Sequence, residues 1–215
     1  MADFNVAQCL MNGGSYSTDE MQDILAEAEA DESVLVYYLS DDVEVDPRPV
    51  RTAVMRAAVN TTQDRLNLYA EYMELLLDSL QSMAATQAVI SPVSITEMAW
   101  EPNHGTSQAL KCALGFVPGI IATDDVFLEI ARRYSQEELP EIDELAIDSV
   151  EELLNVVNGL FTIQLAKEKL TAELGLPKSG ENVQPFGNEQ LRLRVITAFG
   201  SFEAVLSAEE FIELE

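Results

Sequence analysis

Four residues between positions 148 and 159 have types and spacing suited to chemistry on one side of a helix. Residues 142–168 carry apolar side chains at helical spacing, and the predicted core face contains Ala146, Val150, Leu153, Val157 and Leu160. At about 100° per residue, Asn155 lies about 200° around the helix from Leu153. A second stripe is therefore predicted to face solvent, and it contains Asp148, Glu152, Asn155 and Gly159.

The chemistry available to this stripe is positioning. Glu152 and Asn155 are separated by one helical turn, so their Cβ atoms are about 5–6 Å apart on the same side. A carboxylate and an amide so placed can hold a water molecule, or a water molecule and a cation. Gly159 costs about 1 kcal/mol relative to Ala inside a helix, and its missing side chain would let the backbone of another molecule approach. The alternatives are an ordinary solvated helix face and, for Asn158, either a second polar contact or a surface residue.

The charge balance excludes several partners. The chain of 215 residues has 38 acidic and 12 basic residues, which gives a formal net charge of −26. Such a surface repels both a phosphate backbone and anionic lipid headgroups. The first residues lack the basic and apolar regions of a signal peptide, and no apolar run approaches the roughly 20 residues of a membrane span. We therefore expect a cytoplasmic protein that binds neither nucleic acid nor membrane.

Other catalytic constellations lack the residues that they need. His104 is the only histidine, and the two cysteines are distant from each other. Neither a zinc site nor a serine-hydrolase triad can be assembled from this set. The glycines have no nucleotide-binding spacing. We accordingly predict no metal site in this chain.

The elements that would carry the stripe indicate an α/β (α+β) fold. Helices are predicted over residues 65–88, 124–134 and 142–168, and strands over 93–98, 108–116, 119–123, 191–197 and 202–206. Residues 101–105 are predicted to be a turn, and 178–182 a loop. This order favours a two-layer sandwich with a largely antiparallel sheet and long helices on one face. Residues 1–48 form an acidic N-terminal extension and 49–215 the main domain, for which a homodimer through an edge strand is plausible.

The segment from Glu152 to Gly159 resembles the ExxN helix of the CheC/CheX/FliY chemotaxis phosphatases, with Asp148 in the usual place upstream. The flanking segments agree in order with that family. Residues 115–121 resemble the glycine-bounded strand pair of the family. Leu176-Pro177 resembles the dipeptide that follows the ExxN helix, which is the signature helix of the family, and residues 192–206 resemble the terminal hairpin. The resemblance covers roughly residues 65–210.

The resemblance implies a phosphatase for an aspartyl-phosphorylated response regulator. Asn155 would orient the hydrolytic water, and Glu152 would pair with a lysine of the regulator. Asp148, Asn158 and Gly159 would contact that partner. The Mg²⁺ would belong to the regulator, so the chain would need no cofactor of its own.

Two features depart from the family pattern. The first long helix has no ExxN motif, which implies a single site, as in the CheX branch. The acidic residues 1–48 have no counterpart in the family. They motivate the alternative of a non-catalytic docking or regulatory module, in which this segment occupies a basic surface on a partner or folds over the signature helix.

Overall fold

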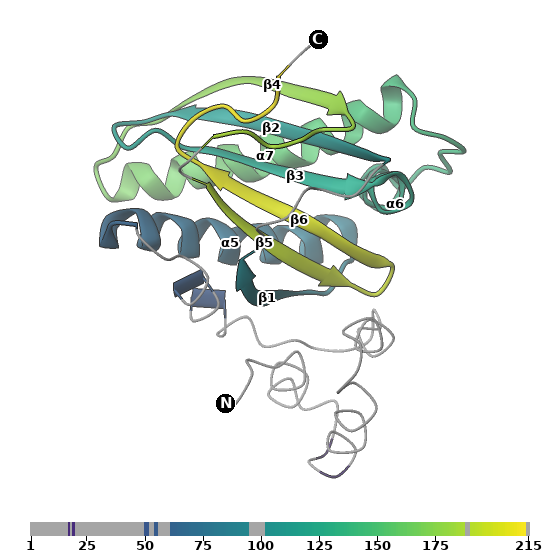
Figure 1. Ribbon diagram of the computed structural model, residues 1–215, viewed down its shortest axis with the longest axis horizontal. Helices are drawn as coiled ribbons and strands as arrows, with labels where there is room; N and C mark the ends of the chain where they lie inside the picture. The colour runs from purple at the N-terminus through teal and green to yellow at the C-terminus, as the bar shows by residue number, and fades with distance from the viewer. Residues whose placement is uncertain are drawn as a thin grey trace. The chain divides into compact units, whose positions relative to one another are not determined.

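The computed structural model describes residues 61–94, 102–187 and 190–213, and the single positions 17, 19, 50, 51, 54 and 55. The elements in these ranges follow in the order α5 (Gln63–Ala84), β1 (Ala88–Ser94), β2 (Asn103–Lys111), β3 (Val117–Thr123), α6 (Asp124–Ser135), α7 (Glu144–Lys167), β4 (Glu173–Glu181), β5 (Gln190–Thr197) and β6 (Gly200–Ser207) (Figure 1). Most of the predicted extension, residues 1–48, lies outside the described residues, as does part of the predicted strand 93–98.

The strands form one sheet in the order β1-β5-β6-β3-β2-β4. Each described pairing is antiparallel: β1 with β5, β2 with β3, β2 with β4, and β3 with β6. The predicted α+β class with an antiparallel sheet is therefore confirmed. The chain divides into two compact units, one made of residues 1–94 and 193–201 and the other of residues 95–192 and 202–215.

The first unit contains α5 and β1. Thr62 caps α5, and its side chain accepts a hydrogen bond from the Arg65 amide at 3.4 Å. Buried apolar residues, including Tyr72, Met73 and Leu76, line the side of α5 that packs in this unit. The helix ends earlier than predicted because Ala85 adopts a left-handed conformation (φ 45°), and β1 begins at Ala88.

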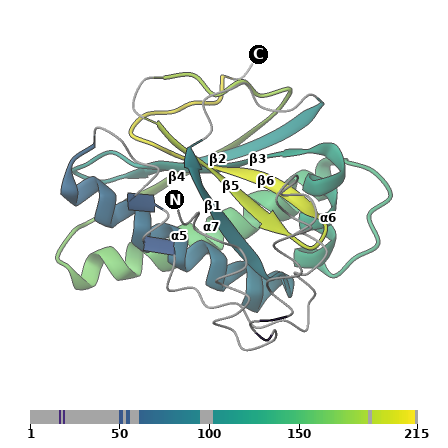
Figure 2. The same ribbon diagram turned by 60° about the horizontal axis from the view of Figure 1, so that its bottom comes forward.

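The second unit has both faces of its strands covered (Figures 1 and 2). α7 contacts β2 and β4, and α6 contacts β3 and β2. On the opposite face, Phe211 and Ile212 pack against Ile121 of β3. Gly119 belongs to this second face, because an added Cβ would lie 2.5 Å from Phe211 Cζ and 2.5 Å from the Thr106 carbonyl oxygen. The C-terminal segment can pack closely on β3 because this residue has no side chain.

Strand alternation in β2 decides which residues face the helices. Thr106 bonds to Ser179 at 2.8 Å, and Ser179 Oγ donates to Glu151 of α7 at 2.7 Å. Ser107, the next residue, instead donates to Glu210 of the C-terminal segment at 2.8 Å. Because successive side chains of a strand point to opposite faces, Gln108 faces α7 with Thr106.

Two predicted boundaries in this unit are wrong. β2 begins at Asn103, so His104 lies in a strand rather than in a turn, with Nδ1 3.0 Å from Asp124 Oδ1. The predicted loop over residues 178–182 is instead largely part of β4, which pairs with β2 alone. Pro177 suggested a loop, but an edge strand tolerates proline because one side needs no ladder hydrogen bonds.

Among the helices of the described ranges, none has the length and apolar character needed to cross a membrane.

Candidate functional site

Helix α7 carries the predicted stripe, and its own sequence sets where it begins. Asp143 is the N-cap, and its Oδ1 accepts a hydrogen bond from the Ala146 amide at 3.0 Å. The inner face is completely buried and includes Val150, Leu153, Val157 and Phe161. Burying each such side chain stabilises the fold by roughly 1.5–3 kcal/mol. This packing holds the opposite face of α7 in a fixed place.

The outer face contains four of the predicted site residues. Asp148 and Glu152 are exposed, and Asn155 and Gly159 are half-buried. The structure therefore brings these residues together on one stripe, as the helical period predicted. Leu160, which was predicted to be in the core, is instead 39% exposed.

The prediction that Asn158 contacts a partner is wrong for the folded chain. Its side chain is completely buried, and its Nδ2 donates to Gln108 Oε1 at 2.8 Å. Asn158 lies about 100° around the helix from Gly159 and only about 40° from Leu154, which is buried, so it stands at the edge of the core face. Asn158 is therefore part of the contact between α7 and β2.

Asn155 is held from two directions. Its Oδ1 accepts a hydrogen bond from Gln108 Nε2 of β2 at 2.8 Å, and its Nδ2 donates to Glu152 Oε2 at 3.3 Å. A carboxamide has two N–H donors and two acceptor lone pairs. These contacts leave Asn155 with one N–H and one lone pair, at the solvent edge of the stripe. The arrangement can orient a small polar molecule beside a carboxylate.

The charge of Glu152 also acts on a neighbouring helix. Burial raises the pKa of the Tyr134 hydroxyl at the end of α6, and the negative charge of Glu152 raises it further. Both effects favour the neutral phenol. Tyr134 therefore adds an uncharged hydroxyl close to the acidic end of the stripe.

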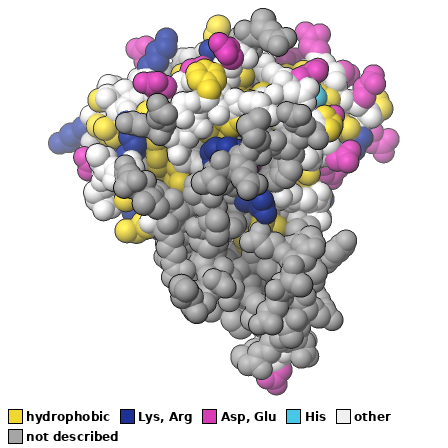
Figure 3. Space-filling model, in the orientation of Figure 1, with side chains coloured by type: hydrophobic (Ala, Val, Ile, Leu, Met, Phe, Trp, Pro, Cys, Tyr) yellow, Lys and Arg dark blue, Asp and Glu magenta, His cyan; other side chains and the backbone are white. Residues whose placement is uncertain are grey.

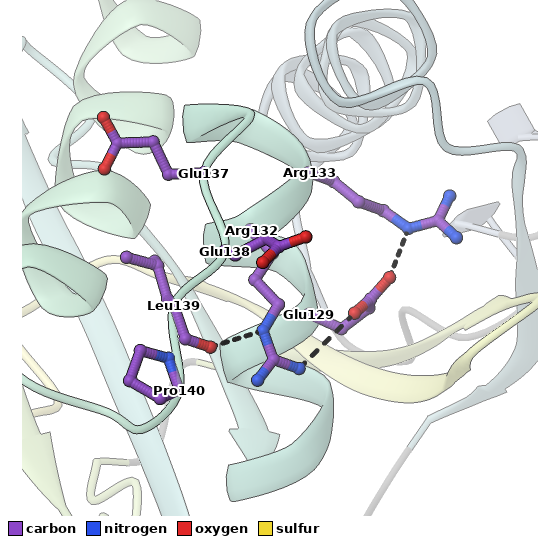
Figure 4. A pocket seen from close by; sticks show the side chains of 7 residues that line it. All are labelled: Glu129, Arg132, Arg133, Glu137, Glu138, Leu139 and Pro140. Atoms are coloured by element: carbon purple, nitrogen blue, oxygen red, sulfur yellow. Dashed lines mark hydrogen bonds and ion pairs between the residues drawn. The ribbon is translucent and has the colours of Figure 1, made fainter.

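One hollow in the second unit lies away from this stripe. It has a volume of about 560 Å³ and is lined by Glu129, Arg132, Arg133, Glu137, Glu138, Leu139 and Pro140 (Figure 4). Its arginines are engaged: Arg132 Nε donates to the Leu139 carbonyl at 2.6 Å, and Arg133 Nε donates to Glu129 at 2.9 Å. Both arginines of this lining are therefore bonded to groups of the chain itself.

Acidic side chains are spread over the described surface in the view of Figure 3. Within the described ranges, no three His, Cys, Asp or Glu side chains are grouped so that they could hold a metal ion.

On α5, Glu71 and Glu74 lie 3.7 and 3.8 Å from Arg51 and so form ion pairs. The described candidate for chemistry is therefore the stripe on α7.

Sequence reasoning missed two residues of this site. Gln108 is separated from Asn155 by 47 positions, and no periodic pattern links them. Tyr134 was assigned to a helix but not to the site. An inward-facing glutamine on a strand is the only local sign that Gln108 needs polar partners.

No family model matches this chain, and no curated protein matches it. Among solved structures, the chemotaxis protein CheX from Vibrio vulnificus aligns with 68% of this chain and 99% of its own, at 15% identity and a TM-score of 0.56. A CheC-like superfamily protein from Shewanella aligns with 68% of this chain and 98% of its own, at 18% identity and a TM-score of 0.52. FliY from Thermotoga maritima aligns with 70% of this chain and 93% of its own, at 16% identity and a TM-score of 0.51. This chain therefore has the fold of the CheX, CheC-like and FliY proteins, as its sequence predicted.

Proposed function

We propose that this protein is a phosphatase that removes phosphate from an aspartyl-phosphorylated receiver domain. The observation that carries the proposal is the oriented Asn155 beside Glu152 on an exposed helix face. Asn155 is fixed from the sheet side through Oδ1, and its Nδ2 keeps one N–H that is not used in the contact with Glu152. The shared fold with chemotaxis proteins supports the proposal.

In the proposed reaction, Asn155 donates its free N–H to the oxygen of a water molecule. The other lone pair of that water attacks phosphorus, and the bond between phosphorus and the aspartyl oxygen breaks, with its electron pair going to the aspartate. Both protons of the water stay with the phosphate, so that the acyl phosphate dianion and water give dihydrogen phosphate and the free aspartate. Phosphoryl transfer passes through a loose transition state, so positioning and charge neutralisation supply most of the catalysis. On this proposal the Asn155 amide supplies the positioning, and the receiver domain supplies the cations that neutralise the phosphoryl charge.

The acids of the stripe define the chemistry of the partner. Asp148 and Glu152 have no basic neighbour among their hydrogen bonds and ion pairs in the described residues. A receiver domain would supply complementary charge through a lysine, which pairs with Glu152, and through its own Mg²⁺. On this proposal the chain needs no cofactor of its own and acts in the cytoplasm.

The direct test is phosphate release from purified receiver domains of the same genome. Each receiver is phosphorylated with a small-molecule phosphodonor and Mg²⁺, freed of the donor, and followed with and without this chain. Acceleration of phosphate loss is the expected result. If the chain forms stable complexes with one or more receivers but accelerates phosphate loss from none of them, the result would contradict the phosphatase proposal and favour a docking module.

Replacement of Gly159 with Ala should separate folding from docking. An added Cβ would meet nothing within 4 Å, so the variant should gain about 1 kcal/mol in the free energy of unfolding. Affinity for the phosphorylated receiver should nevertheless fall about tenfold, because a methyl group inserted into a close contact is overpacked. Denaturant unfolding and titration calorimetry measure the two quantities.

Gln164→Ala is the matched control for this variant, since Gln164 is exposed on the same helix but off the stripe. It should leave affinity for the receiver unchanged. Wild-type affinity in Gly159→Ala would mean that no backbone of the partner approaches this position.

A further inference from the structure

We infer that Gln108 is a positioning residue that sets which way the Asn155 carboxamide faces. The inference rests on the proposed function of Asn155 and names a residue on β2 that does not touch the reacting groups. Gln108 is 1% exposed and bonds to α7 at two points, Asn155 and Asn158. It therefore links the candidate site directly to the sheet.

A single backbone carbonyl determines the orientation of the three amides. The Gly175 oxygen can only accept a hydrogen bond, so the Gln108 atom 3.0 Å from it must be the donor Nε2. The same Nε2 lies 2.8 Å from Asn155, whose facing atom must then be the acceptor Oδ1. Oε1 of Gln108 consequently faces Asn158 Nδ2 at 2.8 Å. Exchanging the oxygen and nitrogen of any of these three side-chain amides would place two donors or two acceptors against each other.

The Gly175 carbonyl lies at an irregularity of β4. Gln108 pairs with Pro177 and Leu110 pairs with Leu174, so two residues of β4 stand opposite one residue of β2. This is the arrangement of a β-bulge, which re-aims backbone groups locally. The bulge includes Gly175, and its carbonyl reaches the Gln108 side chain at this point.

The consequence for Asn155 is a defined outer face. Because Oδ1 is turned toward Gln108, Nδ2 is turned toward Glu152 and solvent. The terminal torsion of an asparagine is broad and roughly two-fold, so an Asn155 without this anchor would sample both faces. An anchored carboxamide always presents its N–H to the water in the proposed reaction, and a misplacement of about 1 Å can cost up to a hundredfold in rate.

The test uses Gln108→Met, which keeps the volume of the side chain and removes the amide. We expect kcat for phosphate release to fall about tenfold, with the Kd for the phosphorylated receiver unchanged, because the misoriented amide affects the water rather than docking. The matched control is Thr106→Val. Thr106 is also buried on the helix-facing side of β2 and links through Ser179 to Glu151, but not to Asn155.

Both variants lose a buried polar contact between β2 and its neighbours, so both should lower Tm. Only Gln108→Met should lower kcat. Equal loss of kcat in the two variants would reduce Gln108 to a structural role and overturn the inference. Wild-type kcat in Gln108→Met would overturn it as well.

Nuclear magnetic resonance separates this inference from the proposed function, because it needs no activity. In the wild-type protein, the carboxamide protons of Gln108 should be protected from hydrogen exchange, since both of its N–H groups are bonded in the interior. In Gln108→Met, the side-chain amide signals of Asn155 should shift and sharpen. In Thr106→Val, the Asn155 signals should stay at their wild-type positions. Rapid exchange of the Gln108 carboxamide would refute the positioning role even if Gln108→Met failed to fold. A wild-type chain that is inactive on every receiver would instead refute the proposed function.

Discussion

Replacement of Asn155 with Ala should lower the rate of catalysed phosphate release about 10²–10³-fold, the loss typical of removing one preorganised polar group. The fold should remain intact, because Asn155 is only half-buried. Its removal takes one acceptor from Gln108, but Gln108 Nε2 still donates to the Gly175 carbonyl. Phosphate release under single-turnover conditions and circular dichroism measure the two effects.

Gln164→Ala again provides a control on the same helix, and it should keep the wild-type rate. Retained activity in Asn155→Ala would show that another group orients the water. Loss of the folded state would show that the contact with Gln108 is needed for the packing of α7.

Replacement of Glu203 with Ala should lower the free energy of unfolding by about 3–5 kcal/mol, the loss typical of removing one partner of a buried ion pair. Glu203 is 1% exposed, and Arg192 Nε donates to its Oε2 at 2.8 Å. The Arg192 side chain is itself only 11% exposed. Denaturant unfolding followed by circular dichroism gives this quantity.

The double variant Arg192→Met with Glu203→Leu removes both charges and should recover most of the lost stability. A single variant Glu203→Ala that unfolds like the wild type would mean that solvent reaches Arg192 readily. Equal destabilisation in the single and double variants would mean that packing at these positions, rather than charge, is responsible.

Local sequence was sufficient for the main features of α7. The helical period identified its length and its exposed stripe, because the angle between two helix residues depends only on their separation. Alternation of apolar and polar residues likewise found the strand β5, whose side chains alternate between partly and fully buried positions from Gln190 to Val195. Features that depend on neighbouring residues along the chain were therefore predicted correctly.

The burial of residues at the boundary between the buried and exposed faces of α7 was predicted less well. Leu160 and Asn158 lie near the boundary between the two faces of α7, where the helical period does not tell which side a neighbour will cover. The structure exposes Leu160 and buries Asn158, because β2 and Gln108 lie on the side of Asn158. The polarity of a side chain alone is misleading at such a boundary, since a polar residue can be buried when it has a partner.

The sequence by itself determined that Glu152 and Asn155 share an exposed helix face, and it indicated the fold. Only the tertiary structure decided that β4 is a strand, that its bulge brings the Gly175 carbonyl to Gln108, and that Gln108 bonds to Asn155. Those contacts join residues tens of positions apart. Their geometry depends on strand register and on the packing of α7 against the sheet, and neither is encoded in the spacing of nearby residues.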